Sequence, residues 1–219
     1  GIYSNLYKDI YFDKKYGIKE TQHNFIKANN LASRFKKSDK FIISELGFGT
    51  GLSFLMTLKL WKETKKPNAK LIYISFESAP LTKIELNNVY KKLSGVKILF
   101  NQLIKKLPIL YQSTHRIFFD SENVELILIY DDFNSLKNFK FKADAWFLDG
   151  FAPKKNKSAW NSKLFEQIYL STKFQGTFST FTSAGHVRRG LSNSGFFVSK
   201  VAGFGNKKES LIGIKKPPS

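Results

Sequence analysis

Apolar side chains in this chain occur in two kinds of run, short continuous ones and longer ones with helical spacing. The short runs are rich in β-branched and aromatic residues, which is typical of buried strands. They predict strands at residues 41–46, 71–77, 115–119, 124–130, 143–149, 177–182, 196–201 and 209–214. The longer runs predict helices at residues 52–63, 81–93, 98–111, 162–172 and 187–192, with Pro108 disturbing the end of the third.

The order of these segments, in which strands alternate with helices, predicts an α/β layer with a mainly parallel sheet. Residues 120–123 join two strands closely enough for a hairpin. No helix separates the last two strands, so we expect them to pair antiparallel at an edge. We therefore predict a Rossmann-like α/β fold with a mainly parallel seven-stranded sheet and an antiparallel edge strand.

A glycine-rich loop follows the first predicted strand and precedes the first predicted helix. It carries Gly47, Gly49 and Gly51, with Glu45 just before them. Glycines at such a turn let the backbone approach a ligand closely, although a purely structural turn is the simpler alternative. A P-loop is excluded because no Gly-Lys-Ser/Thr follows, and a dinucleotide site requires a glycine where Leu52 stands. The pattern favours S-adenosyl-L-methionine (SAM), which brings no pyrophosphate.

Acidic residues end the neighbouring strands. Glu77 follows the second strand, where an acid can accept both ribose hydroxyls of an adenosine, although a solvated acid is the alternative. Asp131 and Asp132 follow the fourth predicted strand, and we expect one of them to receive the adenine amino group. Asp149 ends the strand at 143–149. Ligands of open α/β sheets bind beyond the carboxyl ends of the strands, so these acids mark the expected site.

The net charge of +19, with a pI near 9.9, indicates a polyanionic partner such as a nucleic acid. The alternative is a lysine-rich genome that places Lys at any exposed position. The chain has no cysteine, which excludes disulfides and thiolate metal sites and favours the cytoplasm. No cluster has metal-ligand spacing, and no apolar run is long enough to cross a bilayer.

Several segments together resemble the methyltransferase domain of the MnmC family. They are residues 9–12, 20–21, 45–52, 75–77, 147–156, 180–189 and 203–209, which cover nearly the whole chain in order. The resemblance implies a class I SAM-dependent methyltransferase fold, with an N-terminal family-specific extension at 1–40, the catalytic domain at 41–214 and a tail or linker start at 215–219. Three positions depart from the family pattern: Asp131 and Gln175 stand in place of glycines, and Asn206 replaces a basic residue.

The same resemblance implies a reaction at the wobble uridine of certain tRNAs, in which 5-aminomethyl-2-thiouridine becomes 5-methylaminomethyl-2-thiouridine. SAM would be held by Glu45, Gly47, Gly49, Gly51, Glu77 and Asp132. Asp149 would be catalytic and orient the amine, or would only contact the methionine moiety of SAM. In many family members a flavin-dependent oxidase makes the substrate amine, so an oxidase in cis or in trans is an expected partner.

Basic and aromatic residues near these segments are candidates for contacting the tRNA anticodon arm. Lys154, Lys155, Arg188 and Arg189 would bind phosphates, with a solvated basic loop the alternative for the lysines. Phe151 would stack on an extruded base, and Trp160 is either a second stacking platform or a core residue. Two other functions remain open at this point: methylation of a small molecule or a protein, and non-catalytic binding of nucleic acid.

Overall fold

The apolar runs form one sheet in the computed structural model, which describes residues 14–93, 95–109, 113–149, 159–205 and 209–219. The strand order is β3-β4-β2-β1-β5-β6-β8-β7. The strands are β1 (Lys40–Leu46), β2 (Lys70–Phe76), β3 (Thr114–Phe119), β4 (Val124–Ile129), β5 (Ala143–Leu148), β6 (Thr172–Thr180), β7 (Phe197–Ala202) and β8 (Glu209–Ile214). Strands β4, β2, β1, β5 and β6 are parallel, and the antiparallel strands lie at the two edges.

The predicted α/β class with a mainly parallel sheet is confirmed, but the sheet has eight strands rather than seven. The additional strand arises because the predicted hairpin adds β3 to the outer edge of β4. The chain reverses there through the short helix η2 (Asp120–Glu122), and Asn123 follows with a left-handed φ of 55°. Asparagine tolerates this backbone region better than most residues.

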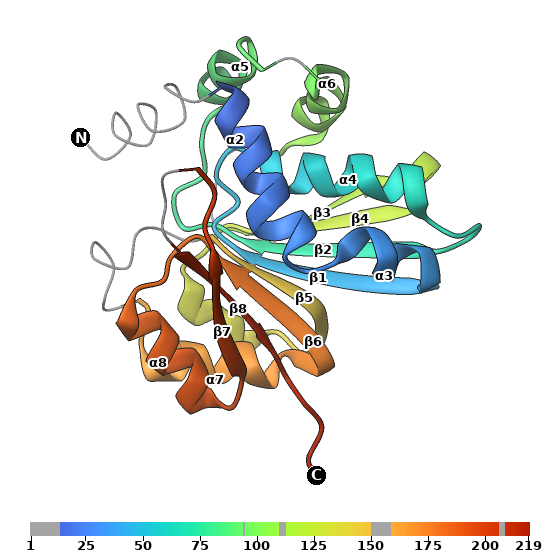
Figure 1. Ribbon diagram of the computed structural model, residues 1–219. Coiled ribbons are helices and arrows are strands. Elements are labelled where there is room, and N and C mark those ends of the chain that lie inside the picture. The colour runs from blue at the N-terminus through green and yellow to red at the C-terminus, as the bar shows by residue number, and fades with distance from the viewer. Residues whose placement is uncertain (1–13, 94, 110–112, 150–158, 206–208) are drawn as a thin grey trace.

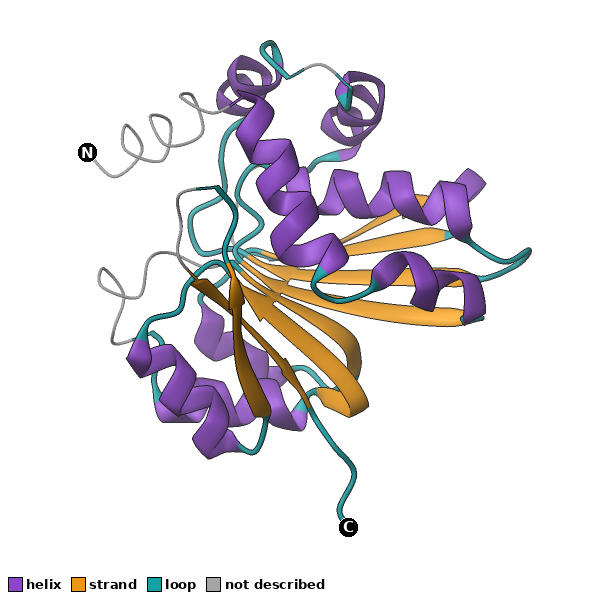
Figure 2. Ribbon diagram, viewed as in Figure 1, coloured by secondary structure: helices purple, strands orange, loops and turns teal. Residues whose placement is uncertain are grey.

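Helices cover both faces of the sheet (Figures 1 and 2). One face is covered by α2 (Lys14–Thr21), the π-helix η1 (Gln22–Lys27), α3 (Leu31–Lys37), α4 (Leu52–Thr64), α5 (Lys83–Tyr90) and α6 (Lys97–Lys106). The other face is covered by η3 (Phe133–Asn138), α7 (Ser162–Leu170) and α8 (Gly185–Ser194). Each face of the sheet therefore has its own hydrophobic core.

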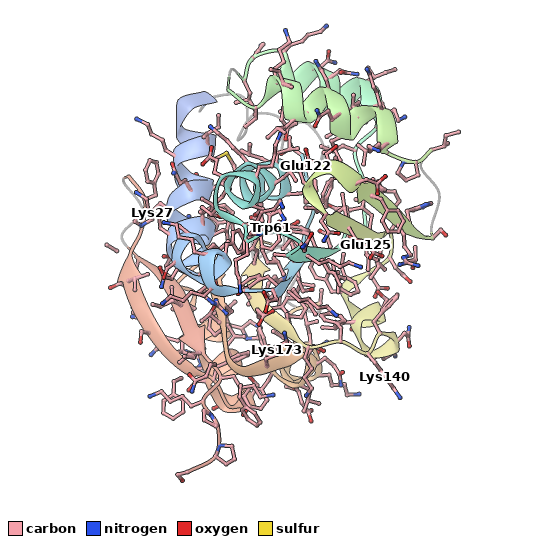
Figure 3. The ribbon with its side chains drawn as sticks, turned by 90° about the vertical axis from the view of Figure 1, so that its right-hand side faces the viewer. Lys27, Trp61, Glu122, Glu125, Lys140 and Lys173 are labelled. Atoms are coloured by element: carbon pink, nitrogen blue, oxygen red, sulfur yellow. The ribbon has the colours of Figure 1, made fainter. Side chains whose placement is uncertain are left out.

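The core beneath α4 is built largely from aromatic rings. Trp61 is fully buried and meets Phe35 edge to face, with the ring centroids 5.0 Å apart. Its indole Nε1 donates a hydrogen bond of 2.9 Å to the carbonyl of Glu122, so α4 is tied to the turn between β3 and β4 (Figure 3). Burying such large side chains stabilises the fold through the area removed from water.

The opposite core lies between the sheet and α7 and α8. Trp160 is 2% exposed and contacts Phe165 and Phe133. Gly190 of α8 lies directly over the Phe165 ring, which leaves no room for a Cβ at this position. Trp160 is therefore a core residue, and the alternative, that it stacks on a nucleotide base, was wrong.

The N-terminal helices pack on the same layer as α4. Phe25 contacts Phe147 and Phe181, and its side chain is fully buried. Asn29 donates to the hydroxyl of Ser179 at 2.8 Å. The division of the chain at residue 40 into an extension and a domain stays a prediction. Within the part of the chain that the structure describes, no helix has the length and apolar character to span a membrane.

Candidate active site

Side chains from three adjacent strands meet at the carboxyl edge of the sheet. In the register, Glu45 of β1 lies beside Ser75 of β2 and Phe147 of β5. Because side chains alternate along a strand, Glu45, Glu77 and Asp149 fall on the face covered by α4. The strand topology thus brings together the acids that the sequence predicted to share one site.

The glycine loop follows β1 directly and leads into α4. Gly47, Gly49 and Gly51 have φ values of 92°, 55° and 80°, a left-handed region that favours glycine. A Cβ on Gly49 would meet nothing within 4 Å, whereas one on Gly51 would stand 2.9 Å from the Phe48 ring. Gly51 is therefore required for packing, and the loop presents open space at Gly49.

Glu77 links the glycine loop to the segment after β2. Its carboxylate accepts hydrogen bonds from the backbone N–H of Gly49 at 2.7 Å and of Ala79 at 3.2 Å. The side chain is 4% exposed, and burial raises its pKa, while the backbone N–H groups oppose that rise. Glu77 lies where the sequence placed it, at the strand end against the glycine loop.

Glu45 is buried beneath the same loop. One carboxylate oxygen, Oε1, accepts a hydrogen bond of 2.8 Å from the Ser75 hydroxyl, and Oε2 has no hydrogen-bond partner among the described residues. Burial raises the pKa of Glu45 to about 8, and the hydroxyls of Ser75, Tyr73 and Ser53 act in the opposite direction. A buried carboxylate with an unpaired oxygen is suited to receive a cationic ligand.

Asp132 and Asp149 complete the acidic edge. Asp132 is exposed and caps η3 by accepting a hydrogen bond of 2.8 Å from the backbone N–H of Asn134. Asp149 is partly buried and follows β5 directly. Asp131 accepts from the backbone N–H of Asp132 at 2.8 Å, so the two adjacent acids have different local roles.

The expected tRNA contacts are only partly within the described structure. Arg188 and Arg189 are exposed on α8, which begins soon after the carboxyl end of β6. The predicted contacts at Phe151, Lys154 and Lys155 lie outside the described residues. Of the predicted substrate residues, the two arginines are therefore described, on a helix that follows a strand whose carboxyl end lies at the same edge of the sheet as that of β5.

Two polar residues at this edge were not predicted from the sequence. The Tyr90 hydroxyl donates to the carbonyl of Thr50 at 3.0 Å and so supports the glycine loop, while its ring stacks on Phe100. Tyr73 lies on β2 and influences the pKa of Glu45. The period-two alternation of 71–77 places Tyr73 on the face of Glu77, and this was the available signal.

The residues at this edge of the sheet fit a cationic nucleoside cofactor such as SAM. The observations behind this fit are the unpaired Oε2 of Glu45, the open space at Gly49 and the acids on three strand ends. Among the described residues there is no group of His, Cys, Asp and Glu that could hold a metal ion.

Comparisons with known proteins agree with this assignment. MnmC of Marinomonas sp. (strain MWYL1), named a tRNA 5-methylaminomethyl-2-thiouridine biosynthesis bifunctional protein, is 42% identical over 217 residues, which are 96% of this chain and 32% of that protein. The protein of the same name from Hahella chejuensis is 40% identical over 215 residues, 96% of this chain and 34% of the relative. The chain thus spans about a third of the length of these relatives.

The fold and the family are matched separately. The crystal structure of MNMC2 from Aquifex aeolicus superposes with a TM-score of 0.73 at 23% identity, covering 92% of this chain and 61% of that one, which shows a common fold. A family model described as S-adenosyl-L-methionine-dependent methyltransferase matches residues 94–216, more than half of the chain. The chain therefore belongs to the S-adenosyl-L-methionine-dependent methyltransferase family.

Proposed function

We propose that this protein methylates the wobble uridine of tRNA, converting the amine of 5-aminomethyl-2-thiouridine to 5-methylaminomethyl-2-thiouridine. The observation that carries the proposal is the 42% identity, over 96% of this chain, to a protein named for the biosynthesis of that nucleoside. The net charge of +19 supports a polyanionic substrate.

The glycine loop and the strand-end acids are the proposed binding groups for SAM. Gly47, Gly49 and Gly51 let the backbone approach the cofactor, and Glu77 accepts the ribose hydroxyls. Asp132 has a second carboxylate oxygen available for the adenine amino group, since one oxygen caps η3. Glu45 faces the cationic methionine end.

When bound, SAM supplies a methyl group already activated by its sulfonium, so the protein mainly has to align a neutral amine. We assign this task to Asp149. A carboxylate at the strand end can accept a hydrogen bond from the substrate nitrogen, orient its lone pair and receive the proton that leaves. In the balanced reaction the methyl carbon exchanges its bond to sulfur for one to nitrogen, and one proton is released.

The tRNA is proposed to contact Arg188 and Arg189 of α8, together with Phe151, Lys154 and Lys155. The two arginines are exposed and lie in the first turns of a helix that begins near the acidic edge. The relatives are named bifunctional, and we infer that a flavin-dependent oxidase, in cis or in trans, supplies the amine. From the proposed tRNA substrate we infer a cytoplasmic location.

The test is methyl transfer from labelled SAM to tRNA that carries the unmethylated amine, followed by nucleoside analysis. We expect label in 5-methylaminomethyl-2-thiouridine and none with tRNA that lacks the amine. Label in another nucleoside, or in protein only, would refute the substrate assignment. Asp149→Ala tests the role of Asp149, since full turnover with weakened SAM binding would limit it to cofactor contact.

A further inference from the structure

Tyr73 is a buried tyrosine directly below the proposed cofactor site. It is fully buried on β2, and its ring meets Phe54 of α4 and Phe147 of β5 at centroid distances of 5.0 and 6.0 Å. These aromatic contacts account for the ring but not for the hydroxyl. In the portion of the chain that is described, that hydroxyl has no hydrogen-bond partner.

The Oε2 atom of Glu45 is a second buried polar atom without a described partner. The two side chains lie on one face of the sheet on adjacent strands, because Tyr73 pairs with Ile43, two residues before Glu45. Burial and then Glu45 raise the pKa of Tyr73, and the Tyr73 hydroxyl lowers the pKa of Glu45. Unpaired buried polar atoms are destabilising and rare in native proteins. Two of them side by side at a ligand site indicate a polar contact that becomes a well-formed hydrogen bond when the ligand is present.

The other groups around Glu45 leave Tyr73 as the donor for this oxygen. Ser75 already binds Oε1, and of the two other hydroxyls that act on Glu45, those of Ser53 on α4 and Tyr73 on β2, only that of Tyr73 is buried without a partner among the described residues. Of the remaining titratable neighbours, Glu77 is an acid and Tyr90 donates to the Thr50 carbonyl instead. A second acid, Asp149, acts on the Tyr73 hydroxyl electrostatically and raises its pKa.

We propose that Tyr73 is a positioning residue, whose hydroxyl donates to Oε2 of Glu45 in the SAM-bound protein and fixes that carboxylate toward the cationic end of the cofactor. The inference rests on the proposed use of SAM at this site. A carboxylate oxygen has two lone pairs, so Oε2 can accept from Tyr73 and still face the ligand. The hydroxyl also favours the ionised carboxylate, which attracts a cation.

The test is Tyr73→Phe, which keeps the ring and removes only the hydroxyl. We expect SAM to bind about tenfold more weakly, as for loss of a hydrogen bond to a charged group. The KM for tRNA should not change, and the midpoint of the pH dependence of SAM binding should move to higher pH. The melting temperature of the empty protein should stay equal or rise, because an unpaired buried hydroxyl has been removed.

A double-mutant cycle with Glu45→Gln distinguishes positioning from packing. If Tyr73 acts through Glu45, then Tyr73→Phe has little further effect on SAM affinity in the Glu45→Gln background. Tyr169→Phe on α7 is the matched control, since it removes a hydroxyl on the opposite side of the sheet. It should leave SAM affinity unchanged.

The inference would be overturned if Tyr73→Phe changed neither the affinity for SAM nor the midpoint of its pH dependence. It would also be overturned if the effects of Tyr73→Phe and Glu45→Gln on SAM affinity were fully additive. If the substituted proteins fail to fold, infrared difference spectra of the wild-type protein with and without SAM replace them. A shift of a tyrosine ring mode together with a new carboxylate band is expected, and its absence overturns the inference. Failure of the wild-type protein to bind SAM would instead refute the proposed cofactor site.

Discussion

Proton release on cofactor binding is expected from the burial of Glu45. Burial raises the pKa of this carboxyl from 4.5 to about 8 in the empty protein. At pH 7 roughly nine molecules in ten therefore carry it protonated. A bound cation stabilises the ionised form, so SAM binding should expel this proton.

The expected effect on affinity follows from the same pKa. If SAM requires the ionised carboxylate, its dissociation constant increases about tenfold for each pH unit well below 8, or about fifty-fold from pH 8 to pH 6. The free energy of unfolding of the SAM-free protein should decrease as the pH rises, whereas the affinity for SAM should increase. The folded state holds a proton that the unfolded chain loses near pH 4.5, so stability falls as pH rises from 4.5 to 8, by about 5 kcal/mol if Glu45 acts alone.

Calorimetry measures the coupling between SAM binding and proton release directly. Titrations of SAM from pH 6 to pH 9, in two buffers with different ionisation enthalpies, give both the dissociation constant and the number of protons released. The α-amino group of SAM titrates in the same range, so Glu45→Gln is the matched control that keeps this contribution. We expect the substitution to flatten the pH dependence of affinity and of the empty protein's stability. The same proton release in both proteins would refute the reasoning.

Other predictions concern packing, backbone strain and RNA binding. The Phe178 ring fills the space that a Cβ on Gly213 would need, so Gly213→Ala should lower the free energy of unfolding by about 1–3 kcal/mol in denaturant titrations. Gln175 has a left-handed φ of 67°, and Gln175→Gly should raise the melting temperature, with a gain of about 1 kcal/mol. Replacing Arg188 and Arg189 by Ala should weaken tRNA binding and reduce its salt dependence, with SAM affinity unchanged.

Most of the sheet could be predicted because its strands and helices differ in periodicity. Buried parallel strands give continuous apolar runs, and α4 repeats its apolar residues at helical spacing. The N-terminal helices could not be recognised from periodicity, for a physical reason. The π-helix η1 has a wider turn and shifts the phase between α2 and α3, so no single helical period extends from Lys14 to Lys37.

The candidate site was predictable to the extent that strand order determines it. Carboxyl ends of parallel strands share one edge, so the positions of Glu45, Glu77 and Asp149 at strand ends were sufficient to group them. Burial was harder to foresee. Trp160 is a core residue because α7 and η3 enclose it, and the sequence does not reveal that enclosure. Tyr73 has the sequence context of an ordinary strand residue, because a tyrosine ring fits a buried strand.

The hydrogen bond between Glu77 and the backbone of Gly49 affects how SAM is expected to bind, because a ribose hydroxyl would compete with the Gly49 N–H for the same carboxylate. Glu77, the proposed acceptor for the ribose hydroxyls, already accepts an internal hydrogen bond of 2.7 Å from the backbone N–H of Gly49. An incoming hydroxyl must share or displace that donor, so the net gain is smaller than the number of new contacts implies. In return, the loop holds its curved shape without a ligand, and little ordering of the backbone remains to oppose binding.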